Sequence, residues 1–165
     1  MTEEVLATAS ASAPRRILGV GMMAALGALL LYVALTTPPA SFLWQLFLLV
    51  IGVAALFQAE KTRRATERVI ELTAAGLRDS TGEVIAPIDQ IVRIDRGTFA
   101  IKPSNGFLIR LKTPRARRWL PGLWWAMGRR VGIGGVTPGA QTKFMAQMIE
   151  AMIAERDQAA SSHTT

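Results

Sequence analysis

Two long apolar runs, residues 17–35 and 42–59, follow each other closely near the start of the chain, and neither contains a charged residue. An α-helix rises ~1.5 Å per residue, so each run is long enough to cross the ~30 Å hydrocarbon core of a bilayer. A helix also satisfies its backbone hydrogen bonds internally, as a segment inside lipid must. The sequence therefore predicts an integral membrane protein with a two-helix transmembrane hairpin at residues 15–60.

A secretory signal is the alternative explanation of the first run, because Arg15 and Arg16 precede it. The apolar region of such a signal normally spans ~7–15 residues, which is shorter than this run, and a second apolar run follows here at once. An arginine pair also occurs in twin-arginine export signals, but residues 17–19 fit that pattern poorly. We therefore expect the first run to be a membrane span.

Basic residues lie before the first span and after the second, but not between them. Arg15 and Arg16 precede the first span, and the connection at residues 36–41 carries no charge. The cations after the second span are Lys61, Arg63, Arg64 and Arg68. Short loops rich in lysine and arginine stay on the cytoplasmic side of a membrane. We expect a multi-pass protein with both termini in the cytoplasm and a short external turn.

Few polar groups lie within the spans. Gln45 is the only strongly polar side chain well inside either span, and we expect it to form a hydrogen bond across the hairpin. Small residues either allow the helices to approach closely or simply fill an apolar helix; they are Gly19, Gly21, Ala25, Ala28 and Gly52. Neither span contains an acidic or basic side chain, so the sequence does not favour a channel or a pump.

The 165-residue chain carries a net charge of +7 and has no cysteine. Disulfides, cysteine-bound metals and cysteine nucleophiles are therefore excluded, and the single histidine, His163, lies in a polar terminal segment. Acidic residues in the middle of the chain are scattered among basic neighbours and look like solvated charges; they include Asp79, Glu83, Asp89 and Asp95. This pattern does not favour paired-carboxylate catalysis, so we expect a non-enzymatic protein without a cofactor or a metal.

From about residue 60 the sequence changes to short apolar segments separated by glycine and proline, which is typical of β-strands. The predicted strands are residues 68–73, 76–79, 84–87, 90–96, 98–102, 107–112 and 130–133. Asn105 and Gly106 favour a hairpin turn before residues 107–112, because both tolerate a positive φ. In that hairpin, apolar side chains are expected on one face and basic side chains on the other.

A single amphipathic helix is predicted after the strands. Thr137 is a suitable cap, and Pro138 suits the first helical turn. Apolar residues then recur at helical spacing and are expected to pack on the core rather than to form a peptide-binding groove; they are Phe144, Met145, Met148, Ile149, Met152 and Ile153. The predicted organisation is a flexible tail at residues 1–14, the hairpin, one domain at residues 65–157 and a disordered tail at residues 158–165.

Two short segments before the terminal helix carry a family resemblance. They are residues 72–78, Leu-Thr-Ala-Ala-Gly-Leu-Arg, and residues 84–91, Val-Ile-Ala-Pro-Ile-Asp-Gln-Ile. With the two apolar runs before them and a helix after them, these segments resemble those of small bacterial membrane proteins that have two spans before a pleckstrin-homology-like (PH-like) domain. In those proteins a glycine-leucine turn precedes an Ile-Pro-Trp strand. Ile88 stands where that pattern has tryptophan. The resemblance implies an α+β membrane protein of the bacterial inner membrane, with a PH-like antiparallel β-barrel or sandwich followed by a C-terminal helix.

Cations and tryptophans are concentrated between Arg96 and Gln147, where the sequence has no acidic residue. Tryptophan and arginine together favour a membrane interface, where the indole lies among the headgroups and the guanidinium binds phosphate. The candidate residues for binding lipid or a partner are Lys112, Arg115, Arg117, Arg118, Trp119, Trp124, Trp125, Arg129 and Arg130. Residues 113–130 fit neither a helix nor a strand, and the alternative is that the tryptophans lie in the core and the arginines are solvated.

Two functions follow as hypotheses. The first is a membrane-anchored PH-like module that binds the anionic cytoplasmic leaflet or a protein partner through this basic and aromatic surface. The second is an accessory or assembly subunit of a larger inner-membrane complex, which would use the small residues of the hairpin. The expected partners are membrane lipids and a membrane protein, and both hypotheses are compatible with a homo-oligomer. Nucleic acid needs similar side chains, but a domain held at a membrane does not favour it.

Overall fold

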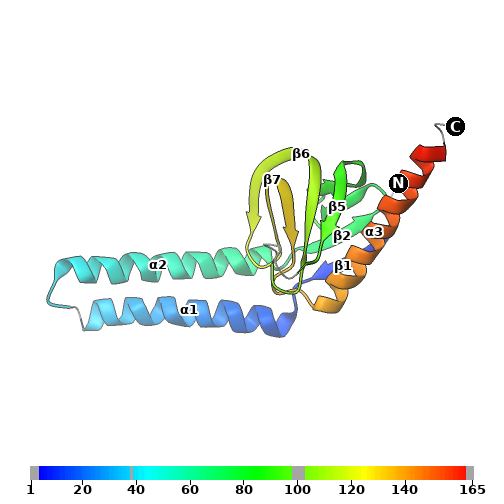
Figure 1. The fold of residues 1–165 in the computed structure, drawn as a ribbon. Helices are drawn as coiled ribbons and strands as arrows, with labels where there is room; N and C mark the ends of the chain where they lie inside the picture. The colour runs from blue at the N-terminus through cyan, green and yellow to red at the C-terminus, as the bar shows by residue number, and fades with distance from the viewer. Residues whose placement is uncertain (1–3, 38, 98–102, 163–165) are drawn as a thin grey trace. The chain divides into compact units, whose positions relative to one another are not determined.

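The computed structural model describes residues 4–37, 39–97 and 103–162 and has an α+β fold (Figure 1). The chain divides into two compact units. One unit is Ala13–Ala65, and the other consists of Met1–Ser12 together with Thr66–Thr165. We call the first the helical hairpin and the second the sheet domain, and each is described by itself.

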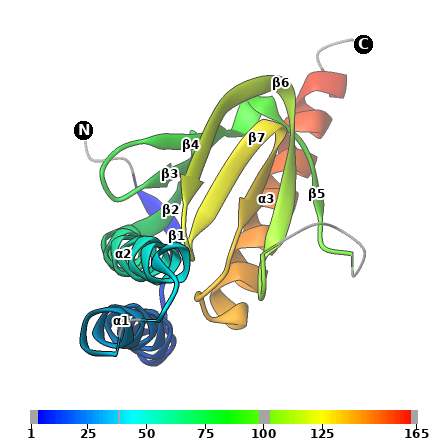
Figure 2. The ribbon, with the colours of Figure 1, turned by 90° about the vertical axis from the view of Figure 1, so that its left-hand side faces the viewer.

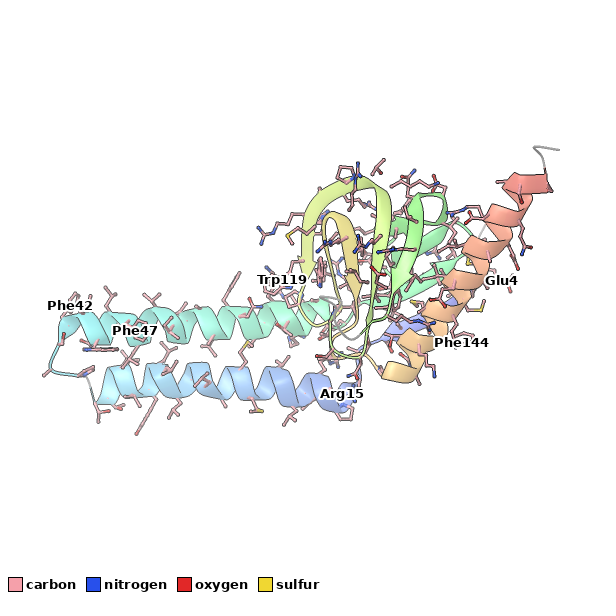
Figure 3. The ribbon with its side chains drawn as sticks, viewed as in Figure 1. Glu4, Arg15, Phe42, Phe47, Trp119 and Phe144 are labelled. Carbon is pink, nitrogen blue, oxygen red and sulfur yellow. The ribbon has the colours of Figure 1, made fainter. Side chains whose placement is uncertain are left out.

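The helical hairpin consists of helices α1 (Ala13–Thr36) and α2 (Phe42–Ala65), which lie side by side and run antiparallel (Figure 1). Both are long and apolar enough to cross a membrane, with mean hydropathies of 2.2 and 2.1 over the most apolar part. Only 11% of that part of each helix is buried, and Figure 3 shows side chains projecting along the whole length of both helices. Most of their apolar surface is therefore uncovered within the protein.

Glycine determines where the two helices approach each other most closely. A Cβ atom on Gly27 would lie 2.9 Å from Leu56 Cγ and 3.0 Å from the carbonyl oxygen of Gly52, and one on Gly52 would lie 2.8 Å from Leu31 Cγ. The expected small-residue contact is therefore confirmed for Gly52, and its partner is Gly27. A Cβ on Gly19 or Gly21 would meet nothing within 4 Å, so these glycines take no part in the contact.

The sheet domain contains two antiparallel sheets. The strands of the first, in spatial order, are β1 (Val5–Ser10), β2 (Val69–Thr73), β3 (Gly76–Asp79) and β4 (Val84–Pro87). The second contains β5 (Ile91–Asp95), β6 (Phe107–Leu120) and β7 (Trp124–Ile133). A short 3-10 turn, η1 (Ile88–Gln90), joins the sheets, and helix α3 (Gly139–Ser162) follows them. Neither sheet closes on itself within the described residues.

Four predicted strands coincide with β2 to β5 to within a residue or so, but three expectations need correction. The expected tail at residues 1–14 instead supplies β1 and the start of α1, and the terminal helix continues to Ser162 where disorder was expected. The strand predicted at residues 107–112 continues to Leu120, and the strand predicted at residues 130–133 begins already at Trp124. Residues 113–130, which were expected to fit neither a helix nor a strand, therefore lie largely in strands. The strand predicted at residues 98–102 lies outside the described residues.

The helical hairpin is inserted between two neighbouring strands of one sheet. β1 pairs antiparallel with β2, and Ser10 lies opposite Val69. α1 begins three positions after β1 and α2 ends shortly before β2, at Ala13 and Ala65. The sequence of β1 is short and only moderately apolar, and its partner lies beyond both helices. Local pattern therefore gave no sign that this segment completes a sheet.

One hydrophobic core lies between the two sheets and α3 (Figure 2). Its members include Ala7, Ala9, Ile70, Leu72, Leu77, Ile85, Ile91, Phe107, Ile109, Leu111, Leu123, Val131, Ile133, Met145 and Ile149. α3 contributes Met145 and Ile149, with Met148, Met152 and Ile153 partly buried beside them. The helical stripe is thus confirmed as core packing, except that Phe144 is 53% exposed.

Candidate cationic and aromatic surface

The candidate residues lie on one long hairpin formed by β6 and β7. Pairing runs from Phe107 opposite Ile133 at the base to Leu120 opposite Trp124 at the tip. At the base, every second side chain is apolar and faces the core, so the sequence pattern predicts a strand there. Toward the tip, arginines replace the alternating apolar residues, and the period that predicts a strand is lost.

The hairpin is strongly bent. Its register shifts on either side of Arg115, and such bulges add a residue to one strand, which increases its twist and curvature. Gly128 lies opposite Arg115 and has a φ of +58°, a conformation that few other residues adopt at low cost. Figure 2 shows the resulting arch of β6. The bend separates a basal arm, next to the core, from an arm that leads to the tip.

The tip returns to the segment that follows β7. The backbone N–H of Gly134 donates to the carbonyl oxygen of Leu123 at 2.9 Å, and that of Val136 donates to Gly122 at 3.0 Å. Val136 in turn accepts a hydrogen bond from the N–H of Ser12 at 2.9 Å. A Cβ on Gly122 would lie 3.1 Å from Thr66 Cγ2. Because Ser12 and Thr66 are the residues through which the chain leaves and re-enters the sheet domain, we call this end the linker pole.

The three tryptophans of the hairpin differ in environment. Trp124 is 3% exposed and belongs to the core, so it is not part of a binding surface. Trp125 is half-buried, and its ring covers Gly132, where a Cβ atom would collide with the indole. Trp119 is 54% exposed and directly precedes the tip residue Leu120 (Figure 3). The alternative that the tryptophans lie in the core is therefore correct for Trp124. Of the three, only Trp119 presents most of its ring to solvent.

Two of the candidate arginines have structural partners. Arg115 is half-buried, and its Nη1 donates to the carbonyl oxygen of Ile85 at 2.6 Å, which ties the bend of the hairpin to β4. Arg118 Nε lies 3.0 Å from a carboxylate oxygen of Glu83. Arg118 remains 62% exposed, so this ion pair leaves it accessible. Arg115 is better described as a residue that fixes the hairpin than as a ligand-binding cation.

The remaining candidate cations are exposed and lie in two places. Lys112, Arg129 and Arg130 lie near the bend, whereas Arg117 lies on the arm that leads to the tip. None of the four has a hydrogen-bond or ion-pair partner among the residues that the structure describes. The nine candidates therefore do not form one patch. They divide into a core residue, a structural arginine, a group at the bend and a group near the tip.

The group near the tip surrounds a hollow of about 350 Å³. Its lining residues are Arg117, Arg118, Trp119, Trp125, Ala126 and Met127. Trp119 pairs across the hairpin with Trp125, and Met127 is 56% exposed. The hollow thus combines two guanidinium groups with aromatic and thioether walls. A ligand with an anionic group next to an apolar group would match these side chains.

A buried carboxylate lies beneath this region, at the end of β3. Asp79 is fully buried, although the sequence suggested a solvated charge. Its Oδ1 accepts hydrogen bonds from the N–H of Thr81 at 2.9 Å and the N–H of Glu83 at 3.0 Å, and its Oδ2 accepts one from Arg68 at 2.7 Å. Burial alone raises the pKa of Asp79, but these bonds and one from the Thr81 hydroxyl outweigh it, so the pKa lies below its ordinary value. The sequence feature that could have indicated this role of Asp79 is the Asp-Ser-Thr-Gly turn at residues 79–82, because an aspartate in a turn commonly accepts hydrogen bonds from the backbone that follows it.

Glu83 connects Asp79's cluster with the hollow. Its carboxylate lies 3.0 Å from Arg118 on β6 and 3.6 Å from Arg68, which also binds Asp79. Arg68 directly precedes β2 and follows the end of α2 by three positions. A chain of alternating charges therefore runs from the linker after α2 to the hollow. Among the described residues, no three histidine, cysteine or acidic side chains are grouped as they would be around a metal ion.

Comparisons with models of protein families, with characterised proteins and with solved structures gave no match for this chain.

Proposed function

We propose that the protein is a two-span protein of the cytoplasmic membrane whose sheet domain binds the anionic inner leaflet through the arm of hairpin β6–β7 that leads to its tip. The domain acts by binding and carries out no chemical reaction. The observation that carries the proposal is the position of the hairpin tip at the linker pole, next to the residues that join the domain to α1 and α2.

The exposure of the helices supports membrane insertion. A long apolar helix in a water-soluble protein is normally a core helix and mostly buried, whereas only 11% of the most apolar part of α1 and α2 is buried. Exposed apolar patches beyond a few hundred Å² mark contact with another molecule or with lipid. The uncovered sides of both helices, which include Leu18, Leu29 and Leu35 on α1 and Phe47 and Phe57 on α2, meet the acyl chains.

The insertion of the hairpin between β1 and β2 supports the topology. Because β1 precedes α1 and pairs with β2 after α2, both ends of the helical hairpin lie in the same compartment. A chain that crosses the membrane twice returns to the compartment in which it started, so two spans satisfy this requirement. Basic residues flank that side, and they include Arg15, Arg16, Lys61, Arg63 and Arg64. The sheet domain and both termini are therefore cytoplasmic.

The order of the elements supports a PH-like domain. A four-stranded and a three-stranded antiparallel sheet pack around one core and are followed by a single C-terminal helix, as the resemblance implied. β1 supplies the seventh strand among the described residues. The N-terminal strand of the domain is thus separated from the rest by the membrane hairpin.

Only short connections along the chain join the linker pole to the two spans, which keeps this pole within reach of the bilayer. Trp119 beside the tip lies at headgroup depth, where an indole is favoured, and Arg117 and Arg118 follow it along the arm. Each cation near an anionic surface contributes ~1 kcal/mol. The cations near the bend lie away from the tip along the hairpin, and screening by salt reduces their contribution.

Membrane insertion and topology are tested first. After carbonate washing of membranes, the full chain should remain in the pellet. Because the chain has no cysteine, single-cysteine variants report accessibility directly. In intact cells an impermeant maleimide should label Ser41→Cys in the external turn but not Ser161→Cys in α3. Release by carbonate, or external labelling of Ser161→Cys, would refute the proposal.

Leaflet binding is tested with the full chain in nanodiscs. A polarity-sensitive fluorophore on Met127→Cys should emit at shorter wavelength in nanodiscs that contain phosphatidylglycerol than in phosphatidylcholine alone. Arg117→Glu should abolish most of that shift, whereas the matched change Arg129→Glu at the bend should preserve it. Identical emission in both lipids from labelled Met127→Cys with no further substitution would refute leaflet binding.

A further inference from the structure

We propose that the hollow lined by Arg117, Arg118, Trp119 and Met127 holds the headgroup of one anionic glycerophospholipid molecule. The inference rests on the proposed function and assigns its ligand. The lipid phosphate lies between the two guanidinium groups, and the glycerol and first acyl methylenes lie against Trp119 and Met127. The hollow's volume of about 350 Å³ is large enough for a phosphate with its glycerol.

The two arginines are prepared for an anion in different ways. Arg117 is exposed and has no partner among the described residues, so a phosphate would be its first strong acceptor. Arg118 is held by Glu83 at 3.0 Å, which orients the guanidinium while leaving it 62% exposed. Guanidinium groups bind phosphate through paired, charge-assisted hydrogen bonds. Phosphate binding at Arg118 therefore competes with Glu83.

The walls of the hollow favour a lipid over a free phosphate. Trp119 and Met127 are both more than half exposed, at 54% and 56%, and neither offers a charge to an ion in water. An amphiphile covers these surfaces with its glycerol and methylenes while its phosphate reaches the arginines. The hollow also lies on the arm that ends at the linker pole, which brings it close to the leaflet that supplies the lipid.

Competition between Glu83 and the lipid has a structural consequence. Glu83 also lies 3.6 Å from Arg68, which binds the buried Asp79 and directly precedes β2. When the phosphate takes Arg118, the Glu83 carboxylate shifts toward Arg68. Removal of the Glu83 charge should therefore strengthen lipid binding.

The test uses the full chain in neutral detergent micelles, titrated with a short-chain phosphatidylglycerol and followed by tryptophan fluorescence. Saturable binding is expected, with much weaker binding of the matching phosphatidylcholine and of free glycerol phosphate. Arg117→Glu and Trp119→Ala should each weaken binding roughly tenfold, and Glu83→Gln should tighten it about threefold. Arg129→Glu, which makes the same change of charge outside the hollow, should alter the affinity less than twofold.

Two outcomes would overturn the inference while the proposed function stands. One is the fluorescence shift in anionic nanodiscs without saturable binding of the soluble lipid. The other is an equal loss of affinity in Arg117→Glu and Arg129→Glu, which would show a diffuse surface effect. Glycerol phosphate binding as tightly as the lipid would overturn the lipid assignment. A correctly folded Arg117→Glu variant, verified by its thermal unfolding, is required for each comparison.

Discussion

The side-chain amide of Gln45 on α2 donates a hydrogen bond to the carbonyl oxygen of Ala34 on α1, at 3.1 Å. In a regular helix that carbonyl would accept from the N–H four residues later, but residue 38 is proline and has no N–H. Gln45 therefore satisfies an acceptor that the helix end leaves open. The expected hydrogen bond across the hairpin is confirmed, and its acceptor is the backbone.

Replacing Gln45 with leucine should destabilise the helical hairpin. The substitution leaves the Ala34 carbonyl without a donor, and interhelical hydrogen bonds in membranes contribute about 0.6 to 2 kcal/mol. The measurement is reversible unfolding of the full chain in mixed detergent micelles. Gln58→Leu is the control, because Gln58 lies on the same helix and its side chain forms no hydrogen bond with another described residue. Equal effects of both substitutions would contradict the assigned role.

Leucine at Gly52 should separate α1 from α2. A Cβ there would already lie 2.8 Å from Leu31 Cγ and 3.2 Å from the Gly27 carbonyl oxygen, so a larger side chain forces the helices apart. Overpacking of this kind typically costs about 1–3 kcal/mol. The same unfolding assay measures it. Gly21→Leu should be tolerated, since a Cβ at Gly21 meets nothing within 4 Å; loss of stability in both variants would argue against this contact.

Asp79→Asn should destabilise the sheet domain by about 2 kcal/mol at neutral pH, because hydrogen bonds to an ionised carboxylate are stronger than those to an amide. The pKa of Asp79 in the folded protein is below the ordinary value of 3.8. Its ionised form therefore adds stability above about pH 4, and this contribution is lost as the pH falls through the lower folded pKa.

Thermal unfolding between pH 7 and pH 2 measures this contribution. The unmodified chain should lose stability below about pH 4, and Asp79→Asn should show a smaller loss over the same range. Asp157→Asn, which removes a carboxylate that is 62% exposed, should leave the pH profile unchanged. A profile of Asp79→Asn parallel to that of the unmodified chain would show that Asp79 is not responsible.

Lysine at Ala9 should disrupt the first sheet. Ala9 on β1 is fully buried, so a charge there loses its hydration without a partner and costs several kcal/mol. Thr8 is exposed on the same strand and lies opposite Glu71, so Thr8→Lys should be neutral or slightly favourable. Limited proteolysis of the full chain in detergent should cut Ala9→Lys faster. Equal resistance of the two variants would mean that β1 is dispensable.

Trp124→Ala should cost about 3–5 kcal/mol, because it removes a large core side chain. Trp119→Ala should change stability by less than about 1 kcal/mol, since most of that ring is exposed. Chemical denaturation of the sheet domain, followed by far-ultraviolet circular dichroism, measures both. The reverse order of effects would place Trp119 in the core and remove it from the binding surface.

The sequence was sufficient where a local period or a local turn determines the structure. The apolar runs predicted α1 and α2, and the alternation around Ile109 and the stripe around Ile149 predicted core-facing residues. Gln45 was identifiable because a lone amide in an apolar helix needs a partner. These features depend on interactions within a few residues or within one helical pair.

Features that depend on distant pairing could not be predicted. β1 looks like a tail because its partner lies beyond both helices, and the outer part of β6 lost its alternation where arginines face solvent on a bent ribbon. Trp119 and Trp124 lie in the same cluster of the sequence, yet one is exposed and the other buried. The bulges around Arg115 and the return of the tip to Val136 determine which of these two tryptophans is buried.

Insertion of the two helices between β1 and β2 sets an order of events during synthesis. The ribosome completes β1 first, and this strand remains unpaired until both helices have been synthesised and β2 has emerged. In the proposed two-span topology, failure of one helix to insert would leave the two strands on opposite sides of the membrane. Under that proposal, completion of the sheet depends on correct insertion of both helices, and a wrongly threaded chain would expose an unpaired β2 edge.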